Sequence, residues 1–240
     1  MKHRFLLCAV VVVGWLVSHA GGFTGEKPST TKPGRESDAE RSARHLRIAA
    51  RRAGTIVIVH RGASAFAPEN SHAAYAAAMD YGSDGCELDL RRTRDGVLVL
   101  FHDDMLDHLT GGFGAVSQLT YEELAALRPQ RQCGRALYGG APTFAALLEL
   151  ARQRAMLLHL DVKEPGLEDD IARQLDNADA WDHVVSINTY NAARLRTHPK
   201  LKLLAYKGPG LSEARRDMEP DAVQAQLPST TIILPYQRQL

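Results

Sequence analysis

The sequence predicts an α/β protein with a mainly parallel sheet, and two observations support this class. From Thr55 onward, short apolar runs alternate with stretches of helical periodicity, which is typical of strands that are joined by helices. The composition, with 45% hydrophobic and 24% charged residues over 240 positions, is globular and excludes a wholly disordered chain. The formal net charge of +1 gives no electrostatic reason to expect a nucleic-acid partner, and we predict none.

Residues 1–20 are predicted to be a secretory signal peptide that is not part of the fold. A basic start is followed by the apolar run Phe5–Val17 and by Ser18 and Ala20, the small residues of a cleavage site. The run is shorter than the roughly 17–25 residues that cross a bilayer, so an uncleaved membrane anchor is the alternative and not the main interpretation. We therefore expect export to the periplasm or the extracellular space.

Residues 21–54 are predicted to precede the folded domain, which we place at 55–240. The first part, up to Ser37, is rich in Gly, Pro, Ser, Thr and Lys and is interpreted as a flexible linker. A short basic helix is expected over 38–52, with the arginines Arg41, Arg44, Arg47, Arg51 and Arg52. This helix is either a solvated surface or a contact with an anionic membrane surface. No protein partner is predicted.

Each element of the domain has a local signal. The β-branched run Thr55–His60 predicts a buried strand. Asn70 or Ser71 caps a helix that Gly82 ends. The further predicted strands are Gly85–Leu90, Val97–His102, Met156–Lys163, Val184–Ile187, Leu201–Tyr206 and Ala222–Leu227. The further predicted helices open at the capping box Thr120–Glu123 or cover Phe144–Arg152, Asn191–Arg196 and Ser212–Met218.

The connection between the second and third predicted strands does not fit this alternation. Only Arg91–Gly96 joins them, whereas a parallel crossover usually needs a dozen or more residues. Either this crossover lacks its helix or the local pairing is irregular.

For the whole sheet, a doubly wound topology competes with a (β/α)8 barrel. The lack of a G-x-G-x-x-G motif after the first strand argues against a nucleotide-binding doubly wound sheet.

Ionisable residues lie at or near the C-terminal ends of four consecutive predicted strands. They are His60 and Arg61, then Glu87 and Asp89, then His102, then Asp161 and Lys163. Such residues are rare in buried strands unless they are paired or bind a metal. Parallel α/β folds build their active sites at this end of the strands. Because side chains alternate with period two, Glu87 and Asp89 share one face, as do Asp161 and Lys163.

Three converging carboxylates without a cysteine cluster predict a hard divalent cation, Mg²⁺ or Ca²⁺. The predicted ligands are Glu87, Asp89 and Asp161. Arg61 and Lys163, together with the cation, would offset the charge of a phosphate. His60 and His102 would act as a general base and a general acid. The residues thus indicate metal-assisted cleavage of a phosphate ester.

Seven short motifs occur in a defined order between residues 60 and 163. They are His60–Ser64, Pro68–Asn70, Glu87–Asp89, Thr93–Gly96, Phe101–Asp103, Pro142–Thr143 and Asp161–Lys163. In these motifs the sequence resembles the glycerophosphodiester phosphodiesterase family, strongly over residues 55–163 and weakly beyond. The resemblance implies a (β/α)8 barrel and the hydrolysis of a small-molecule glycerophosphodiester to sn-glycerol 3-phosphate and an alcohol.

The resemblance also implies a role for each matching residue. His60 and His102 match the catalytic acid/base pair, and Arg61 and Lys163 match the cations that contact the phosphate. Glu69 matches a family glutamate near the first histidine, in a supporting role. The positions that match the metal ligands are Glu87, Asp89 and Asp161.

The sequence departs from the family pattern at three places. Asp161 stands where the family usually has Glu, so its carboxylate is one methylene closer to the strand. His108 and Leu109 stand where the family commonly has Arg-Thr, which alters a loop near the site. The family's last helix and its eighth strand with Trp-Thr-x-Asn have no counterpart. We therefore expect the C-terminal barrel unit to be truncated or missing, with Thr231–Leu234 as an improvised strand, and the edges of the first and seventh strands to be open.

Two other functions stay open on the sequence alone. One is a lysophospholipase D- or sphingomyelinase D-like lipid phosphodiesterase, because related barrel enzymes of that kind use Asp at the position of Asp161 and the basic segment 38–52 favours membrane contact. The other is a non-catalytic, truncated barrel.

Cys86 and Cys133 remain after removal of the signal peptide. They are expected to be free thiols, although the sequence does not determine whether they pair.

Overall fold

The computed structural model separates residues 1–34 from a compact unit at 35–240, and the elements below belong to the second unit. The structure describes residues 36–53, 56–127, 131–132, 135–136, 140–187, 192–203, 205–206 and 230–234. The predicted signal peptide, most of the predicted linker, Cys133, the predicted helix over 212–218 and the predicted strand over 222–227 lie outside these residues. None of the helices in the described part is long and apolar enough to cross a membrane.

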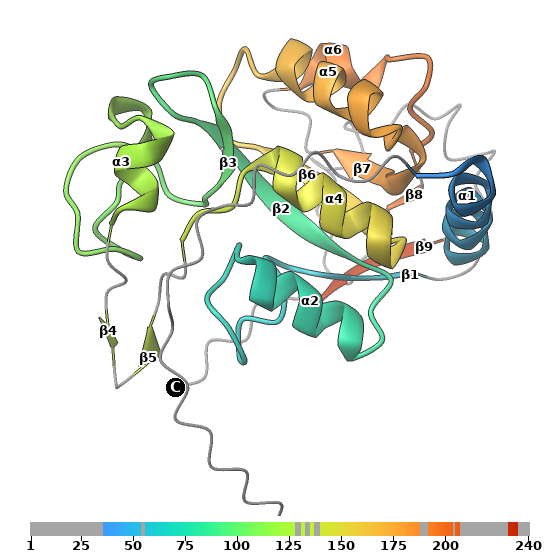
Figure 1. Ribbon diagram of the computed structural model, residues 1–240, viewed down its shortest axis with the longest axis horizontal. Coiled ribbons are helices and arrows are strands. Elements are labelled where there is room, and N and C mark those ends of the chain that lie inside the picture. The colour runs from blue at the N-terminus through green and yellow to red at the C-terminus, as the bar shows by residue number, and fades with distance from the viewer. Residues whose placement is uncertain are drawn as a thin grey trace, which may run out of the picture. The chain divides into compact units, whose positions relative to one another are not determined.

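The sheet is parallel along its main path, which confirms the predicted α/β class. In spatial order its strands are β7 (Val184–Ile187), β6 (Leu157–Val162), β2 (Gly85–Arg92), β1 (Ile56–Val59), β9 (Thr230–Leu234) and β8 (Ala205–Tyr206). Each neighbouring pair on this path is parallel. Over the described residues the architecture is that of an incomplete (β/α)8 barrel (Figure 1).

Helices cover the outer face of this sheet. The main ones are α2 (His72–Asp80), α4 (Phe144–Arg154) and α5 (Glu168–Ala178), followed by the short α6 (Ala193–Arg196). Ser71 caps α2 by accepting a hydrogen bond from the N–H of Ala74, as predicted. Cys86, Leu88 and Leu90 of β2 are fully buried in the same core cluster as residues of α2 and α4. The apolar face of β2 therefore packs under the helices, and its other face is left for the site.

The described part of the chain also contains shorter elements. They are η1 (Val116–Gln118), α3 (Tyr121–Ala125), the hairpin of β4 (Arg131–Gln132) and β5 (Arg135–Ala136), and η2 (Trp181–His183). The predicted capping box at Thr120 is present, since its hydroxyl accepts from the N–H of Glu123 while the Glu123 carboxylate accepts from the N–H of Thr120.

Of the two alternatives for the short connection Arg91–Gly96, the irregular local pairing is confirmed. The third predicted strand is therefore not a parallel strand of the barrel, and only the other three strands that carry predicted site residues are parallel. Strand β3 (Leu98–Leu100) pairs antiparallel with β2, with Leu90 opposite Leu100. The short connection forms a tight turn, in which the N–H of Thr93 donates to the carbonyl of Val97 at 3.0 Å. The chain therefore returns beside β2, and the N–H of Phe101 donates to the carbonyl of Asp89 at 3.0 Å. This hairpin carries His102 back toward Asp89.

The expected open edge of the first strand is also corrected. Strand β9 pairs with β1 over four residues, from Ile56 opposite Thr231 to Val59 opposite Leu234, and on its other side with β8. The run Thr230–Leu234 is β-branched at all positions but the last, which favours a strand. The improvised last strand that the sequence suggested is therefore present and covers the edge of β1.

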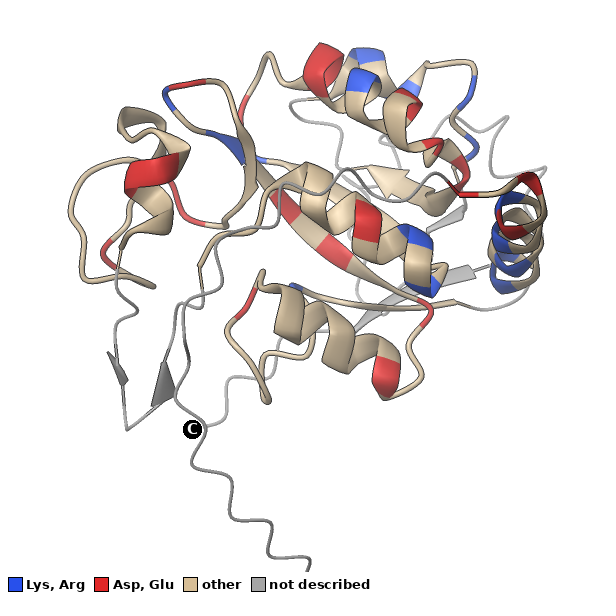
Figure 2. Ribbon diagram, viewed as in Figure 1, with Lys and Arg blue, Asp and Glu red and all other residues tan. Residues whose placement is uncertain are grey.

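Helix α1 (Asp38–Arg52) confirms the helix that was expected over 38–52, and it belongs to the same compact unit as the sheet. Its Ile48 is buried with Ile56, Ile58, Leu157 and Val185, close to where the strands begin. Figure 2 shows basic residues along α1 and acidic residues along β2.

Most of the arginines on α1 bind groups of the protein. The Arg44 side chain is wholly buried and pairs with the carboxylates of Glu36 and Asp179, each at 3.0 Å. Arg52 donates to backbone carbonyls, including that of Val184 at 3.1 Å. Arg51 pairs with Asp84 at 3.2 Å. The prediction that α1 is a fully solvated basic helix is therefore wrong. Its contact with a membrane surface stays a prediction.

Candidate active site and metal centre

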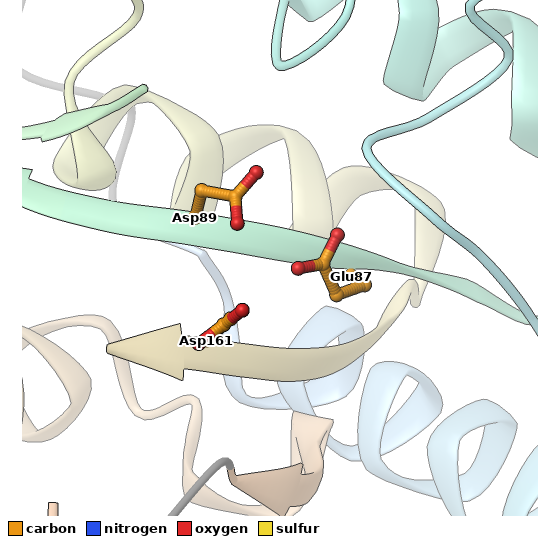
Figure 3. A group of neighbouring side chains, drawn as sticks. All are labelled: Glu87, Asp89 and Asp161. Atoms are coloured by element: carbon orange, nitrogen blue, oxygen red, sulfur yellow. The ribbon is translucent and has the colours of Figure 1, made fainter. Parts of the chain in front are cut away.

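The pairing of β2 with β6 brings the three predicted carboxylates together. In this register Asp89 lies directly opposite Asp161, and Glu87 lies opposite His159. One carboxylate oxygen from each of Glu87, Asp89 and Asp161 lies within 4.8 Å of the others. Figure 3 shows the three side chains turned toward one space from the two neighbouring strands. Glu87 and Asp89 are buried and Asp161 is partly exposed, so the cluster is open on one side.

Asp89 is the most enclosed of the three carboxylates. Its Oδ2 accepts a hydrogen bond from Asn70 Nδ2 at 2.7 Å and lies 3.2 Å from Arg61 Nε, while its Oδ1 lies 2.9 Å from Lys163 Nζ. Burial alone would raise the pKa of Asp89, but the charge of Lys163, the Asn70 hydrogen bond and the charge of Arg61 outweigh it and lower that pKa. Asp89 is therefore held ionised in the interior by two predicted site cations.

The pKa of Glu87 is shifted in the opposite direction to that of Asp89. Burial, reinforced by the charges of Asp89 and Asp161, raises the pKa of Glu87 well above its ordinary value, although the N–H of Arg61 donates to its Oε2 at 3.0 Å. The charges of Asp89 and Asp161 thus disfavour the ionised form of Glu87, and additional positive charge at this cluster would offset that repulsion.

The donor set fits a hard divalent cation. Three carboxylate oxygens from two rigid strands are the ligand type that Mg²⁺ and Ca²⁺ prefer. Positive charge is favoured at this place, because the Lys163 ammonium donates to Asp161 while it pairs with Asp89. Burial would lower the pKa of Lys163, but the charge of Asp89 and the hydrogen bond to Asp161 outweigh it and raise that pKa. Glu87, Asp89 and Asp161 are thus the residues that could hold the ion.

The segment after β1 is bent sharply so that its polar groups face the cluster. Arg61 and Asn70 both have positive φ, 55° and 54°, which is uncommon for residues with a side chain and often marks functional sites. The N–H of Asn70 donates to the carbonyl of Arg61 at 3.0 Å and closes this loop. Gly62 is needed here, because a Cβ on it would lie 2.8 Å from the carbonyl carbon of Ala74. Glu69 accepts from Arg61 Nη1 at 3.0 Å and fixes the guanidinium.

One of the two predicted catalytic histidines, His60, borders the cluster, and the other, His102, is near enough for its charge to act on His60. Nε2 of His60 is 3.8 Å from Oε2 of Glu87. Burial, with added repulsion from the charges of Arg61 and His102, lowers the pKa of His60. Nδ1 of His102 donates to Oδ1 of Asp103 at 2.6 Å. Arg91 donates to the carbonyl of His102 through Nε and Nη2, at 2.9 and 2.7 Å, and so fixes its backbone.

Several residues belong to this site although they are not among the predicted site residues. Asn70 was expected only as a helix cap within a family motif, and it is the buried amide that binds Asp89. Tyr75, on the first turns of α2, donates its hydroxyl to Asn70 Oδ1 at 2.6 Å. Asp103 and Arg91 hold His102. His159 is not one of the three clustered carboxylate-bearing residues, and its Nδ1 is hydrogen-bonded to Ser186 Oγ at 2.5 Å.

Comparison with known proteins agrees with this geometry. The pattern of the glycerophosphoryl diester phosphodiesterase family matches residues 60–221, a stretch that starts at His60 and includes all the predicted site residues. The chain is 35% identical over 153 residues to a glycerophosphodiester phosphodiesterase of Caldanaerobacter subterraneus subsp. tengcongensis. That match covers 61% of this chain and 63% of the relative, so the chain spans less than two thirds of the relative's length.

Solved structures share the fold. The crystal structure of glycerophosphodiester phosphodiesterase from Agrobacterium tumefaciens str. C58 has a TM-score of 0.56 and 27% identity, over 63% of this chain and 67% of that chain. A phosphodiesterase from Oleispira antarctica, solved in complex with the product sn-glycerol-3-phosphate, has a TM-score of 0.57 and 23% identity, over 76% of this chain and 85% of that chain. Since the family pattern covers well over half of the 240 residues, the chain belongs to the glycerophosphoryl diester phosphodiesterase family.

Proposed function

We propose that the protein is a metal-dependent phosphodiesterase that hydrolyses glycerophosphodiesters to sn-glycerol 3-phosphate and an alcohol. The observation that carries this proposal is the cluster of Glu87, Asp89 and Asp161, with ligand oxygens within 4.8 Å of one another. The family of the chain supports the substrate class, and the product bound by the Oleispira antarctica protein is the one that this reaction would release.

Two side chains are proposed to bind the substrate phosphate. Arg61 and Lys163 are the cations that border the carboxylate cluster, and both are mostly buried. Arg61 is fixed by Glu69, so its guanidinium does not have to be ordered when the phosphate binds. A divalent cation on Glu87, Asp89 and Asp161 would withdraw negative charge from the phosphate oxygens.

The two histidines are proposed to move the protons. Burial lowers the pKa of His60, which favours its neutral form, and His60 accepts a proton from the water molecule whose oxygen attacks phosphorus. His102 donates Nδ1–H to Asp103, which leaves its Nε2 for the substrate. His102 acts as an imidazolium with a second proton on Nε2. As the bond from phosphorus to the alcohol oxygen breaks, this proton passes to that oxygen, so that one proton is taken up by His60 and one is given by His102.

The purified protein tests this proposal directly. We expect release of sn-glycerol 3-phosphate from glycerophosphocholine with Mg²⁺ or Ca²⁺, loss of release in EDTA, and its return when the ion is restored. Parallel reactions with detergent-dispersed lysophosphatidylcholine and sphingomyelin test the lipid alternative. A folded protein that cleaves only the lipids would replace the proposed substrate class. A folded protein that cleaves none of these substrates would contradict the proposed activity.

Export also stays a proposal. The apolar run within residues 1–20 and its basic start support a cleaved signal peptide and a location outside the cytoplasm. Sequencing the N-terminus of the protein recovered from the periplasm or the medium tests it. A mature chain that starts near residue 21 is expected, and an intact Met1 on cytoplasmic protein would contradict it.

A further inference from the structure

A second histidine binds the aspartate that holds His102. Asp103 accepts a hydrogen bond on Oδ1 from His102 Nδ1 at 2.6 Å and another on Oδ2 from His108 Nδ1 at 2.8 Å. Each carboxylate oxygen thus has its own imidazole. His108 is one of the positions at which the sequence departs from the common family pattern.

The turn that carries His108 is anchored on both sides of it. Leu106 and Leu109 are buried, with exposed fractions of 1% and 5%. Thr110 donates to the carbonyl of Leu106 through its N–H at 3.0 Å and through its hydroxyl at 2.7 Å, and the N–H of Leu106 donates to the carbonyl of Gly114 at 3.0 Å. The His108 side chain itself is 52% exposed. The fold therefore presents this imidazole to Asp103 without using it to fill the core.

Asp103 is an acceptor at both oxygens. Its burial alone would raise its pKa, but the hydrogen bond from His102 and the charges of His102 and His108 outweigh burial and lower the pKa of Asp103. An ionised carboxylate can only accept, so each imidazole donates from Nδ1.

We propose that His108 is a positioning residue for His102 and acts through Asp103. A carboxylate that is held at one oxygen can still rotate about its Cβ–Cγ bond, whereas donors at both oxygens fix its plane. With that plane fixed, His102 keeps Nδ1 as its N–H and keeps Nε2 for the substrate, in the way that partners of an active-site histidine set its tautomer and orientation. The catalytic consequence rests on the proposed proton transfer by His102.

Two variants at position 108 distinguish loss of the hydrogen-bond donor to Asp103 from loss of the imidazole ring. In His108→Asn the amide Nδ2 takes the place of imidazole Nδ1, so the bond to Asp103 is kept, while His108→Ala removes it. His72→Ala is the matched control, because His72 is an exposed histidine on α2 that makes no contact used in the mechanism. All three variants are expected to unfold at the wild-type temperature.

The first readout does not depend on activity. Two-bond ¹H–¹⁵N spectra of the histidine rings in the full chain report the tautomer of His102, and its signals are assigned by their loss in His102→Ala. At alkaline pH, where the imidazole is neutral, we expect His102 as a fixed Nδ1–H tautomer in the wild type, in His108→Asn and in His72→Ala, and a mixed or exchange-broadened ring in His108→Ala. An unchanged His102 ring in His108→Ala would overturn the proposal.

The second readout is turnover of glycerophosphocholine. His108→Ala should lower kcat about 2- to 10-fold, the range for one hydrogen bond, and leave KM unchanged, while His108→Asn should restore the wild-type kcat. Equal losses in His108→Asn and His108→Ala would overturn the donor role. If the wild type shows no turnover, the proposed function fails. The ring spectra then still show whether His108 fixes the His102 ring through Asp103.

Discussion

His183 makes the stability of the fold depend on pH, and this can be worked out from its contacts. The side chain is fully buried, its Nδ1 donates to the carbonyl of Met156 at 2.8 Å, and its Nε2 accepts from Arg44 Nη1 at 3.1 Å. Protonation would place an N–H of His183 against a guanidinium. Burial, reinforced by the charge of Arg44, therefore lowers the pKa of His183 from 6.5 to about 4.

The sign and the size follow from these two pKa values. Between them the unfolded chain binds a proton at this position and the folded chain does not, so the free energy of unfolding falls as the pH drops from 6.5 toward 4. At 1.36 kcal/mol per pKa unit the full effect is about 3 kcal/mol. About 2 kcal/mol of it is lost between about pH 7.5 and pH 5.

Urea unfolding of the wild type and of His183→Asn at these two pH values measures the effect. The asparagine amide keeps the bond to Met156 and does not titrate, and the other histidines are common to both proteins. We expect the wild type to lose about 2 kcal/mol more than the variant on going to the lower pH. Equal losses of unfolding free energy in the two proteins would refute the conclusion that His183 is buried as a neutral imidazole. The result matters for function, because Arg44 and His183 join α1 to the sheet that carries the site.

Three further predictions concern the site. Asp161→Asn should weaken the affinity for Mg²⁺ or Ca²⁺ while urea unfolding without the ion stays close to wild type; an unchanged metal titration would remove Asp161 from the ligands. His102→Ala should lower turnover by roughly 10²- to 10⁴-fold with an unchanged circular dichroism spectrum, the range for a general acid; near-wild-type turnover would refute its role. Tyr75→Phe should cost about 1 kcal/mol of unfolding free energy, because buried Asn70 loses a donor; a variant as stable as the wild type would show that this hydrogen bond contributes nothing.

The sequence predicted the components of the site but not the way they meet. The period of two placed Glu87 and Asp89 on one face of a strand, and the same rule held for Asp161 and Lys163. That Asp89 lies opposite Asp161 is a matter of register between two strands that are far apart in the chain, and no local pattern contains it. The contact of Tyr75 with Asn70 was missed for a similar reason, because a tyrosine on a helix face is usually only a core residue.

The sequence did not predict features that depend on strand pairing or on contacts between residues far apart in the chain. The connection Arg91–Gly96 was recognised as too short for a crossover, yet only the antiparallel pairing of β3 shows that it places His102 beside the cluster. The β-branched run at Thr231–Leu234 was visible in the sequence, but its pairing with β1 was not. Arg44 was predicted to lie on a helix that either is solvated or contacts a membrane surface, and it is buried because Asp179 and His183, more than 130 positions away, surround it.

The central claim is that the carboxylates of β2 and β6 form a working metal site. Release of sn-glycerol 3-phosphate from glycerophosphocholine by the wild type and by Glu87→Gln, at saturating Mg²⁺ or Ca²⁺ and in EDTA, tests it most directly. We expect release by the wild type only with the ion, and release by a folded Glu87→Gln that is lower by about 10²-fold or more. Wild-type rates in Glu87→Gln, or in the wild type in EDTA, would contradict the claim.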